Sequence, residues 1–340
     1  MKAYLSYLRI VSTFAVVVLH VAAPYVLHFG NAKKNTWETA HFFDSFVRFC
    51  VPVFLMISGA LLLDKDEKLT IFLQKRLKRI LFPFFFWSIV YFIWIDWKTF
   101  SGKGFMQIFK DFYFGLMHGF SFHFWYIYLI LGLYLFIPIL RKWTISATRK
   151  DILFFLIIWL LTLFINPKTA AYFPKIEWMY FSKYLGYLVL GFYLSKLEIK
   201  SVLKMRILSL LMIISGFLFT FFLTRNSTLE QSSFDKTFYE YLSPNVMLLS
   251  VGIFLFFQTI DFKTNRISVF IDKNTFGIYL VHILILSIFK EKISDSFFIQ
   301  SQILFVFYLL GISVLVFLSS LFCIALLSRI SFLKKSAFIT

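Results

Sequence analysis

Long apolar runs separated by short polar stretches fill the chain from its first residues to its last. A helix that crosses a bilayer needs about 20 mostly apolar residues, with some tolerance for tilt. Ten runs fit this pattern, and they lie near 8–28, 42–63, 80–97, 122–140, 152–166, 180–195, 207–224, 244–260, 275–289 and 303–327. The runs at 152–166 and 180–195 are short, so the pattern fixes the number of spans only to within one or two.

The composition supports the same interpretation. Of the 340 residues, 60% are hydrophobic, 22% are aromatic and only 15% are charged. A soluble domain of this length could not bury so much apolar surface. No internal repeat and no Gly/Ser-rich linker divides the chain. We therefore predict an all-α integral membrane protein, a polytopic bundle of about ten transmembrane helices, that forms a single transmembrane domain over residues 1–340.

Lysine and arginine are distributed unevenly between the predicted loops. Positively charged residues favour the cytoplasmic side of a membrane protein. If the N-terminus is cytoplasmic, that side holds 22 of the 35 Lys and Arg residues, and the other side holds 12. This bias predicts that both termini are cytoplasmic. It also attributes the net charge of +18 to topology and to contact with membrane lipids, so we expect no nucleic-acid partner.

Three segments outside the spans have a distinct character. Residues 64–79 form an amphipathic basic stretch on the predicted cytoplasmic side. Residues 104–119 are aromatic and sparsely charged, so we expect them to lie along the outer interface or to re-enter the membrane under cover of protein. Residues 225–245 form the longest polar outer loop, which could cap whatever lies on that side.

The first span carries an arginine and a histidine in the stretch RIVSTFAVVVLH. Arg9 and His20 are eleven residues apart, which in a helix is about three turns plus 20° and a rise of about 16 Å. They therefore share one face. Arg9 could be a snorkelling anchor and His20 a hydrogen-bonded helix contact. Alternatively, they line a tunnel with a phosphate-binding cation at its mouth and a proton-handling imidazole at its depth.

Further polar residues in or beside the spans are candidates for a site. Arg76 and Arg79 are three residues apart and therefore share a helical face, although each could simply set the topology. His282 is either a core hydrogen-bonding residue or a second polar group of the tunnel. Arg48 could form a structural ion pair with Asp44, four residues earlier, or could orient an acceptor or thioester oxygen.

His123 and Trp125 lie at the predicted outer entry to the fourth span. An aromatic interface belt explains Trp125, while a glycan-binding site would also use such a ring and an imidazole. The spacing does not separate these two interpretations. None of the candidate residues suggests a metal site, so we predict no metal.

The order of these motifs resembles that of the acyltransferase-3 family of membrane acyltransferases. The R-x10-H pattern of the first span is similar to the family's signature. Four further stretches are similar to family motifs in the right order: RFCVPVFLMISGALLL at 48–63, KRLKRILFPFFFWSIVYF at 75–92, HFWYIYLILGLYLFIPIL at 123–140, and NTFGIYLVH at 274–282. The resemblance covers about 10–330 and is strongest to compact members, without a soluble domain, that O-acetylate or O-succinylate surface polysaccharides.

The resemblance implies a function and a set of roles. The protein would be a multi-pass protein of a bacterial plasma membrane. It would transfer an acyl group, most often acetyl, from cytoplasmic acetyl-CoA or another acyl-CoA to a hydroxyl of an extracytoplasmic glycan, glycolipid or lipid-linked sugar. Arg9, Arg76 and Arg79 would bind the CoA phosphates. His20 would act as general base on the acceptor hydroxyl or as a transient acyl carrier.

A transporter or exporter of a lipid-linked glycan is the alternative function. A bundle lined by arginine and histidine could serve either purpose. An exporter would normally show repeat symmetry and Gly- or Pro-broken spans in matching positions, and the sequence shows neither. The identity of the acceptor, the choice of acyl group and the oligomeric state do not follow from the sequence.

Overall fold

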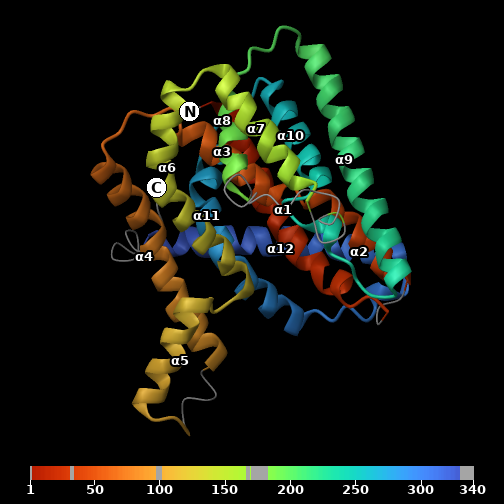
Figure 1. The fold of residues 1–340 in the computed structure, drawn as a ribbon. Coiled ribbons are helices and arrows are strands. Elements are labelled where there is room, and N and C mark those ends of the chain that lie inside the picture. Colours follow the sequence, from red (N-terminus) through yellow and green to blue (C-terminus); the bar gives the residue numbers. More distant parts are fainter. Residues whose placement is uncertain (1, 31–33, 97–101, 166–168, 170–182, 330–340) are drawn as a thin grey trace.

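The computed structural model describes residues 2–30, 34–96, 102–165, 169 and 183–329. In these residues the chain forms helices and no strands, as predicted, and they assemble into a bundle (Figure 1). The α-helices are α1 Ala3–Leu27, α2 Lys34–Val47, α3 Cys50–Leu62, α4 Leu69–Asp96, α5 Phe105–His118, α6 Trp125–Ser146, α7 Arg149–Leu163, α8 Leu185–Ser195, α9 Val202–Gln231, α10 Pro244–Gln258, α11 Arg266–Lys292 and α12 Gln302–Leu327. Short 3-10 helices lie at η2 Phe122–Phe124, η5 Thr237–Tyr239 and η6 Phe298–Gln300.

Each of the ten predicted spans contains a helix in its described part. Eight helical stretches of the described chain are long and apolar enough to cross a membrane. The two short runs correspond to α7 and α8, which have only 15 and 11 residues. Residues 97, 166 and 180–182 of the predicted runs lie outside the described residues. The structure therefore supports eight spans by length, and α7 and α8 account for the difference from ten.

The predicted span at 42–63 lies within one apolar helical stretch, Lys34–Leu62, which a turn divides into α2 and α3. The regular helix is interrupted by a turn at Arg48 and Phe49, although Phe49 keeps α-helical backbone angles. Pro52 lies four residues after Arg48, and a proline has no N–H to bond the carbonyl at that distance while its ring clashes with it. The interruption therefore follows from the sequence. It places the Arg48 side chain at a break inside an otherwise apolar stretch.

One end of the bundle collects the segments that the charge bias places in the cytoplasm. We call it the inner end, and the opposite end the outer end. Hydrogen bonds and an ion pair join the N-terminal residues, the loop before α4, the end of α8 and the loop after α10 at this end. They link Lys2 with Ser195, Tyr7 with Lys263, and Asp64 with Lys196. The predicted cytoplasmic segments thus share one end, and the side of the membrane that this end faces stays a prediction.

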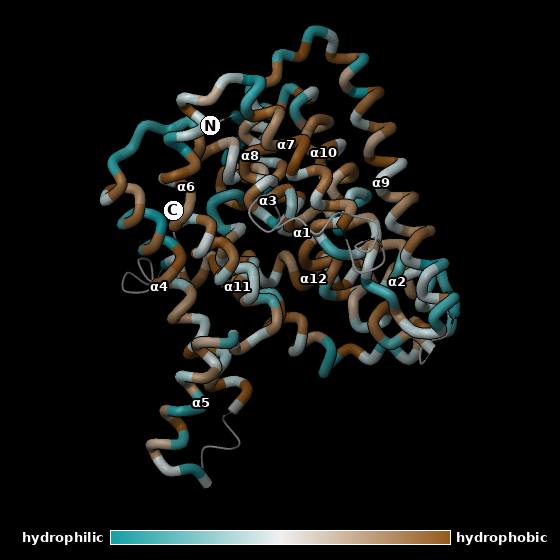
Figure 2. Tube along the Cα trace, viewed as in Figure 1, coloured by the Kyte–Doolittle hydropathy of each residue, from teal (hydrophilic) through white to brown (hydrophobic). Residues whose placement is uncertain are grey.

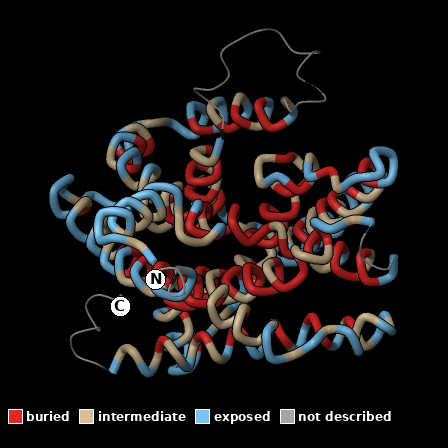
Figure 3. Tube along the Cα trace, turned by 90° about the horizontal axis from the view of Figure 1, so that it is seen from below, coloured by how far each residue is buried: buried red, intermediate tan, exposed pale blue. Residues whose placement is uncertain are grey.

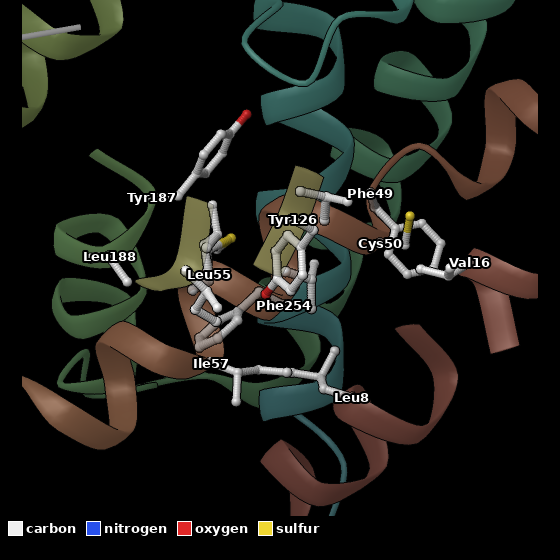
Figure 4. Packing of buried hydrophobic residues seen from close by; sticks show 14 of the residues in the cluster. Leu8, Val16, Phe49, Cys50, Leu55, Ile57, Tyr126, Tyr187, Leu188 and Phe254 are labelled. Atoms are coloured by element: carbon white, nitrogen blue, oxygen red, sulfur yellow. The ribbon is translucent and has the colours of Figure 1, made fainter. Parts of the chain in front are cut away.

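Helix α3 packs closely on α8, and buried apolar side chains of both helices lie together with others from α1, α6 and α10 (Figure 4). A Cβ atom on Gly59 would overlap the backbone of Leu188, and one on Gly191 would overlap the backbone of Met56. Glycines at such positions let two helices approach more closely than other residues allow. Buried apolar side chains such as Leu55 surround this contact.

Hydrophobic residues dominate most of the helices (Figure 2), and many large apolar side chains are exposed. The buried residues are concentrated where the helices face one another (Figure 3). Of the residues in the most apolar stretch of α9, only 22% are buried, so most of that helix would face lipid. Helix α5 extends away from the bundle and has no buried residue (Figure 1). This helix is formed by most of the aromatic stretch 104–119, and its position at a membrane interface stays a prediction.

The basic stretch 64–79 is only partly a loop. Helix α4 begins at Leu69 and continues without a break through the predicted span to Asp96. Arg76 and Arg79 therefore belong to the same rigid helix as the apolar residues that follow them. Because α4 is continuous, it fixes how far Arg76 and Arg79 lie from the apolar part of the same helix.

Candidate active site

Three histidines from distant parts of the chain meet inside the bundle. His20 lies on α1, His123 on η2 and His282 on α11. The ring centre of His282 lies 5.2 Å from that of His20 and 5.1 Å from that of His123, and the rings of His20 and His123 are 6.5 Å apart. We call these three residues the histidine cluster. His123 and His282 are buried, whereas His20 is only half-buried.

The backbone of α11 fixes which nitrogen of His282 carries the proton. The Nδ1 atom of His282 lies 2.6 Å from the carbonyl oxygen of Tyr279. A carbonyl oxygen only accepts hydrogen bonds, so Nδ1 must be the donor. In the neutral ring, Nε2 is then a free acceptor. This Nε2 atom is buried and has no hydrogen-bond partner within the described part of the chain, and it belongs to the ring that faces His20.

Two tyrosines hold the cluster in place. Tyr279 donates its hydroxyl hydrogen to the carbonyl oxygen of His123, which ties α11 to η2. The hydroxyl of Tyr91, on α4, donates to the carbonyl of Leu280 at 3.1 Å and accepts from the N–H of Leu284 at 3.2 Å. These two backbone groups flank His282. The turn of α11 that carries His282 is therefore braced from a neighbouring helix.

His123 has one engaged nitrogen and one free nitrogen. Its Nδ1 lies 2.8 Å from the hydroxyl of Ser121, and its Nε2 is buried without a partner among the residues that the structure describes. The tautomer of His123 stays open, because a hydroxyl can donate or accept. Within the described residues, no group of three His, Cys, Asp or Glu side chains has an arrangement that could hold a metal ion.

Arg9 lies at the inner end of the same two helices. It forms an ion pair of 2.6 Å with Asp272 of α11, and the exposed fractions of the two side chains are 22% and 8%. Helices α1 and α11 thus contact each other through polar residues at two levels. Arg9 and Asp272 meet at the inner level, and His20 and His282 meet about three turns farther along.

Arg76 and Arg79 lie on the inner part of α4, and both are half-buried, while the intervening Lys78 is exposed. Arg79 lies near the charged groups of Arg9, Arg76 and Asp272, so these side chains form one cluster. We call Arg9, Arg76 and Arg79 the arginine cluster. Among the described residues, neither Arg76 nor Arg79 forms an ion pair, in contrast to Arg9.

The carboxylate of Glu67 is already engaged at this end. It accepts a hydrogen bond of 2.7 Å from Lys75, which holds the pKa of the Glu67 carboxyl below its usual range against the opposing effect of partial burial. The charges of Arg76 and Arg141 lower this pKa further. Glu67 is therefore an anion in the neutral pH range, and its hydrogen-bond donor is Lys75 rather than an arginine.

Arg48 connects the histidine cluster with aromatic residues of the outer loop. Its side chain pairs with Asp44 at 2.7 Å, so the predicted i, i+4 ion pair is confirmed. Its guanidinium carbon lies 4.1 Å from the centre of the Tyr239 ring and 5.9 Å from that of Tyr241. It is close enough to His20 to act on that ring electrostatically. The segment 225–245 therefore covers Arg48, which agrees with the capping role that its polarity suggested.

Trp125 is placed beside this group. Its ring stacks on Tyr241, with centres 5.8 Å apart, and lies 6.0 Å from the ring of Tyr184. Its exposed fraction is 39%, so part of the ring is open to the surroundings. Trp125 is also the first residue of α6. It directly follows η2, the 3-10 helix that carries His123.

A family comparison agrees with this arrangement. A family model described as "Acyltransferase domain" matches residues 2–325. The chain belongs to the acyltransferase-3 family. The comparisons with curated proteins and with solved structures each found no match. Membership of this family, together with the many apolar helices, makes the protein a membrane acyltransferase.

For this acyltransferase, the structure groups every site residue that the sequence singled out. The predicted face shared by Arg9 and His20 is directed toward α11, where each residue meets a side chain of that helix. The candidates fall into two sets, Arg9, Arg76 and Arg79 at the inner level, and His20, Arg48, His123, Trp125 and His282 toward the outer level. Their chemical roles stay predictions.

Three residues that complete these sets do not stand out in the sequence. Asp272 lies in a segment that is basic as a whole, yet it neutralises Arg9. A usable signal was present, because Asp272 and His282 are ten residues apart on α11, which resembles the spacing of Arg9 and His20 on α1. Tyr91 and Tyr279 gave no such signal, because tyrosine is common in apolar spans of this chain.

Proposed function

We propose that this acyltransferase moves an acyl group, in the first instance acetyl, from cytoplasmic acyl-CoA to a hydroxyl of a glycan or lipid-linked sugar on the opposite side of a bacterial plasma membrane. One observation carries the proposal. Helices α1 and α11 hold arginines at one level and the histidine cluster about three turns away. A donor with a phosphate-bearing end and a reactive thioester end needs two such levels.

The arginine cluster supports the donor end of this proposal. Guanidinium groups bind phosphate oxygens in a bidentate manner, and unpaired ones are the most available for that contact. Arg76 and Arg79 have no carboxylate in ion-pair contact within the described chain, whereas Asp272 holds Arg9. Arg79 and Arg76 would therefore contact the phosphates first, and the pantetheine arm would extend along α1 toward His20.

The chemical step can follow either of two routes. In the first, a His20 nitrogen takes the proton of the acceptor hydroxyl while the oxygen attacks the thioester carbonyl. The carbon–sulfur bond then breaks, and the sulfur receives that proton. In the second, His20 attacks the thioester and releases the CoA thiolate, and the acceptor oxygen then displaces the imidazole from the acyl group. Both routes end with the acyl group on oxygen and a proton on the thiol.

His282 would orient His20. Its Nδ1–H is held by the carbonyl of Tyr279, so its Nε2 is free to accept a hydrogen bond from an N–H of His20. Such a bond would leave the second nitrogen of His20 as the base or nucleophile. A nucleophile or base that is oriented by a third group is the recurring logic of acyl transfer.

The outer aromatic residues support an acceptor site. Trp125 presents a partly exposed ring beside Tyr184 and Tyr241, and Arg48 lies near both Tyr241 and His20. Aromatic faces bind the apolar faces of sugar rings, and a guanidinium donates hydrogen bonds to hydroxyl or carbonyl oxygens. Arg48, His123 and Trp125 would therefore hold the sugar with its hydroxyl directed at the thioester.

The test uses inside-out membrane vesicles from cells that produce either the wild type or His20→Ala. Acetyl-CoA labelled in the acetyl group is added, and free thiol release and label in the glycan and lipid-linked sugar fractions are measured. We expect thiol release and label transfer for the wild type and neither above background for His20→Ala. An exporter of lipid-linked glycan would release no thiol from acetyl-CoA or succinyl-CoA, and that result would overturn the proposal.

A further inference from the structure

A buried arginine at the inner end of α6 has one hydrogen-bond donor that the surrounding helices leave without an acceptor. Arg141 is only 4% exposed. Its Nε donates to the carbonyl of Leu62 at 3.1 Å, and its Nη1 donates to the carbonyl of Glu67 at 3.2 Å. Its Nη2 is buried and has no partner within the described residues. A buried donor without an acceptor is rare and costly, and more so when it is charged.

Arg76 approaches the same place from α4. The guanidinium carbon of Arg141 lies 4.7 Å from the centre of the Phe72 ring, and that of Arg76 lies 5.8 Å from it. The Nε atom of Arg76 is also buried without a partner among the described residues. The guanidinium groups of Arg76 and Arg141 therefore both lie close to the fully buried ring of Phe72. The nearby carboxylate of Glu67 accepts its short hydrogen bond from Lys75 instead.

An open depression of the protein surface lies near these arginines. A surface depression of about 520 Å³ lies at the loop before α4. It is lined by Lys65, Asp66, Glu67, Lys68, Ile71 and Lys75. Glu67 borders this depression and also accepts the hydrogen bond of Arg141 through its backbone carbonyl. The arginine pair and the depression are therefore neighbours.

The order of groups along the bundle matches the order of groups along acyl-CoA. Helix α4 enters the bundle from its inner end, so Arg79 lies one turn deeper than Arg76. His20 lies deeper still, about three turns beyond Arg9, which is close to Arg79. From thioester to adenine, acyl-CoA presents the pantetheine arm, the pyrophosphate, and then a ribose that carries a 3′-phosphate. If Arg79 contacts the pyrophosphate, the ribose lies nearer the inner end, where Arg76 and Arg141 meet at the Phe72 ring.

We infer that Arg76 and Arg141 bind the 3′-phosphate of acyl-CoA, and that the adenine lies in the depression bordered by Glu67. The inference rests on the proposed function and adds a specificity site to it. A phosphate monoester has three terminal oxygens and close to two negative charges near neutral pH, so two guanidinium groups satisfy it. The phosphate would supply the acceptor that Arg141 Nη2 and Arg76 Nε lack.

The test compares two donors on the same detergent-purified full chain. Acetyl-CoA and 3′-dephospho-acetyl-CoA differ only in this phosphate, and their affinities are measured by equilibrium titration. We expect the wild type to bind acetyl-CoA at least about tenfold more tightly, the size expected for charged hydrogen bonds. Arg141→Gln should reduce this preference to less than about threefold. The matched control is Arg149→Gln, at an exposed inner-end arginine that stacks on Tyr193, and it should keep the full preference.

Other results of this titration would overturn the 3′-phosphate site, the proposed function or both. Equal affinity of the wild type for the two donors, with thioester consumption intact, overturns the 3′-phosphate site and leaves the proposed function standing. Absence of binding by both donors overturns both. If Arg141→Gln does not fold, the wild-type comparison and Arg76→Gln still decide the question. If both variants keep the preference and lose only bound anionic lipid, the site holds a lipid phosphate and the inference is wrong.

Discussion

The two levels at which α1 meets α11 use opposite chemistry. At the inner level, Arg9 is neutralised by Asp272, and Arg76 and Arg79 stand nearby without a carboxylate of their own within the described chain. At the outer level, three imidazoles lie together, and two of them have a buried nitrogen without a hydrogen-bond partner among the described residues. Fixed positive charge suits recognition of phosphate. Rings that can exchange a proton suit acyl transfer.

Acyl transfer across a membrane needs both kinds of group on one pair of helices. A fixed charge binds the donor equally well before and during the reaction, so it sets the affinity more than the rate. A group that takes up a proton during the reaction acts mainly on the rate. Variants at the two levels should therefore separate binding from turnover.

The largest effect is expected at His20. His20→Ala removes the proposed base or acyl carrier, and turnover should fall by about 10³-fold or more while acetyl-CoA still binds. Thioester consumption with saturating donor measures this. His28→Ala is the control, because His28 is an exposed histidine near the end of the same helix. Loss of activity in the control alone would contradict the assignment.

The next effect is expected at His282. His282→Gln removes the ring whose centre lies 5.2 Å from that of His20, and kcat should fall about 10- to 100-fold, less than the about 10²- to 10⁴-fold that a general base contributes. The KM for acetyl-CoA should change little, because His282 lies away from the arginine cluster. Steady-state kinetics separate the two quantities. A change confined to KM would move His282 from an orienting role to a binding role.

A smaller effect, on stability rather than rate, is expected at Asp272. Asp272→Asn leaves Arg9 without its carboxylate, and the pair is only partly exposed. The free energy of unfolding should fall by about 1 to 3 kcal/mol, less than for a fully buried pair. Thermal unfolding of the detergent-purified protein measures it. Arg79→Gln is the comparison, and a larger loss of stability there would reverse the proposed division between paired and unpaired arginines.

The smallest effect is expected at Glu67. Because Lys75 lowers the pKa of the Glu67 carboxyl, the pair stabilises the folded chain above the ordinary pKa of glutamate and loses this effect as the pH falls through the lowered pKa. An exposed pair of this kind contributes about 0 to 1 kcal/mol. The difference in melting temperature between the wild type and Glu67→Gln should be full at pH 6 to 7 and should narrow below about pH 4.5. A difference that grows on acidification would contradict this sign.

Much of the helical framework followed from the sequence, because apolar runs mark spans whatever their partners. The face shared by Arg9 and His20 could also be predicted, since helical spacing alone determines it. The position of η5 over Arg48 was suggested only by the polarity of its segment. Trp125 was placed correctly at the entry to α6 by its neighbours in the sequence.

The rest depended on contacts that a periodic pattern does not encode. Spacing shows which residues share a face, but not which helix that face meets. For this reason Asp272 was not recognised as the partner of Arg9. The break at Arg48 had a readable cause in Pro52, yet the continuous apolar run concealed it. The continuity of α4 across residues 69–96 was concealed in the same way, by a change from basic to apolar residues within one helix.

The most direct test of the central claim is the affinity of acetyl-CoA for the wild type, His20→Ala and Arg79→Gln, measured side by side on the purified chain. We expect His20→Ala to keep the wild-type affinity although it consumes no thioester, and Arg79→Gln to bind at least about tenfold more weakly. Loss of binding in His20→Ala together with wild-type binding in Arg79→Gln would place donor recognition at the histidine cluster and contradict the separation of the two levels.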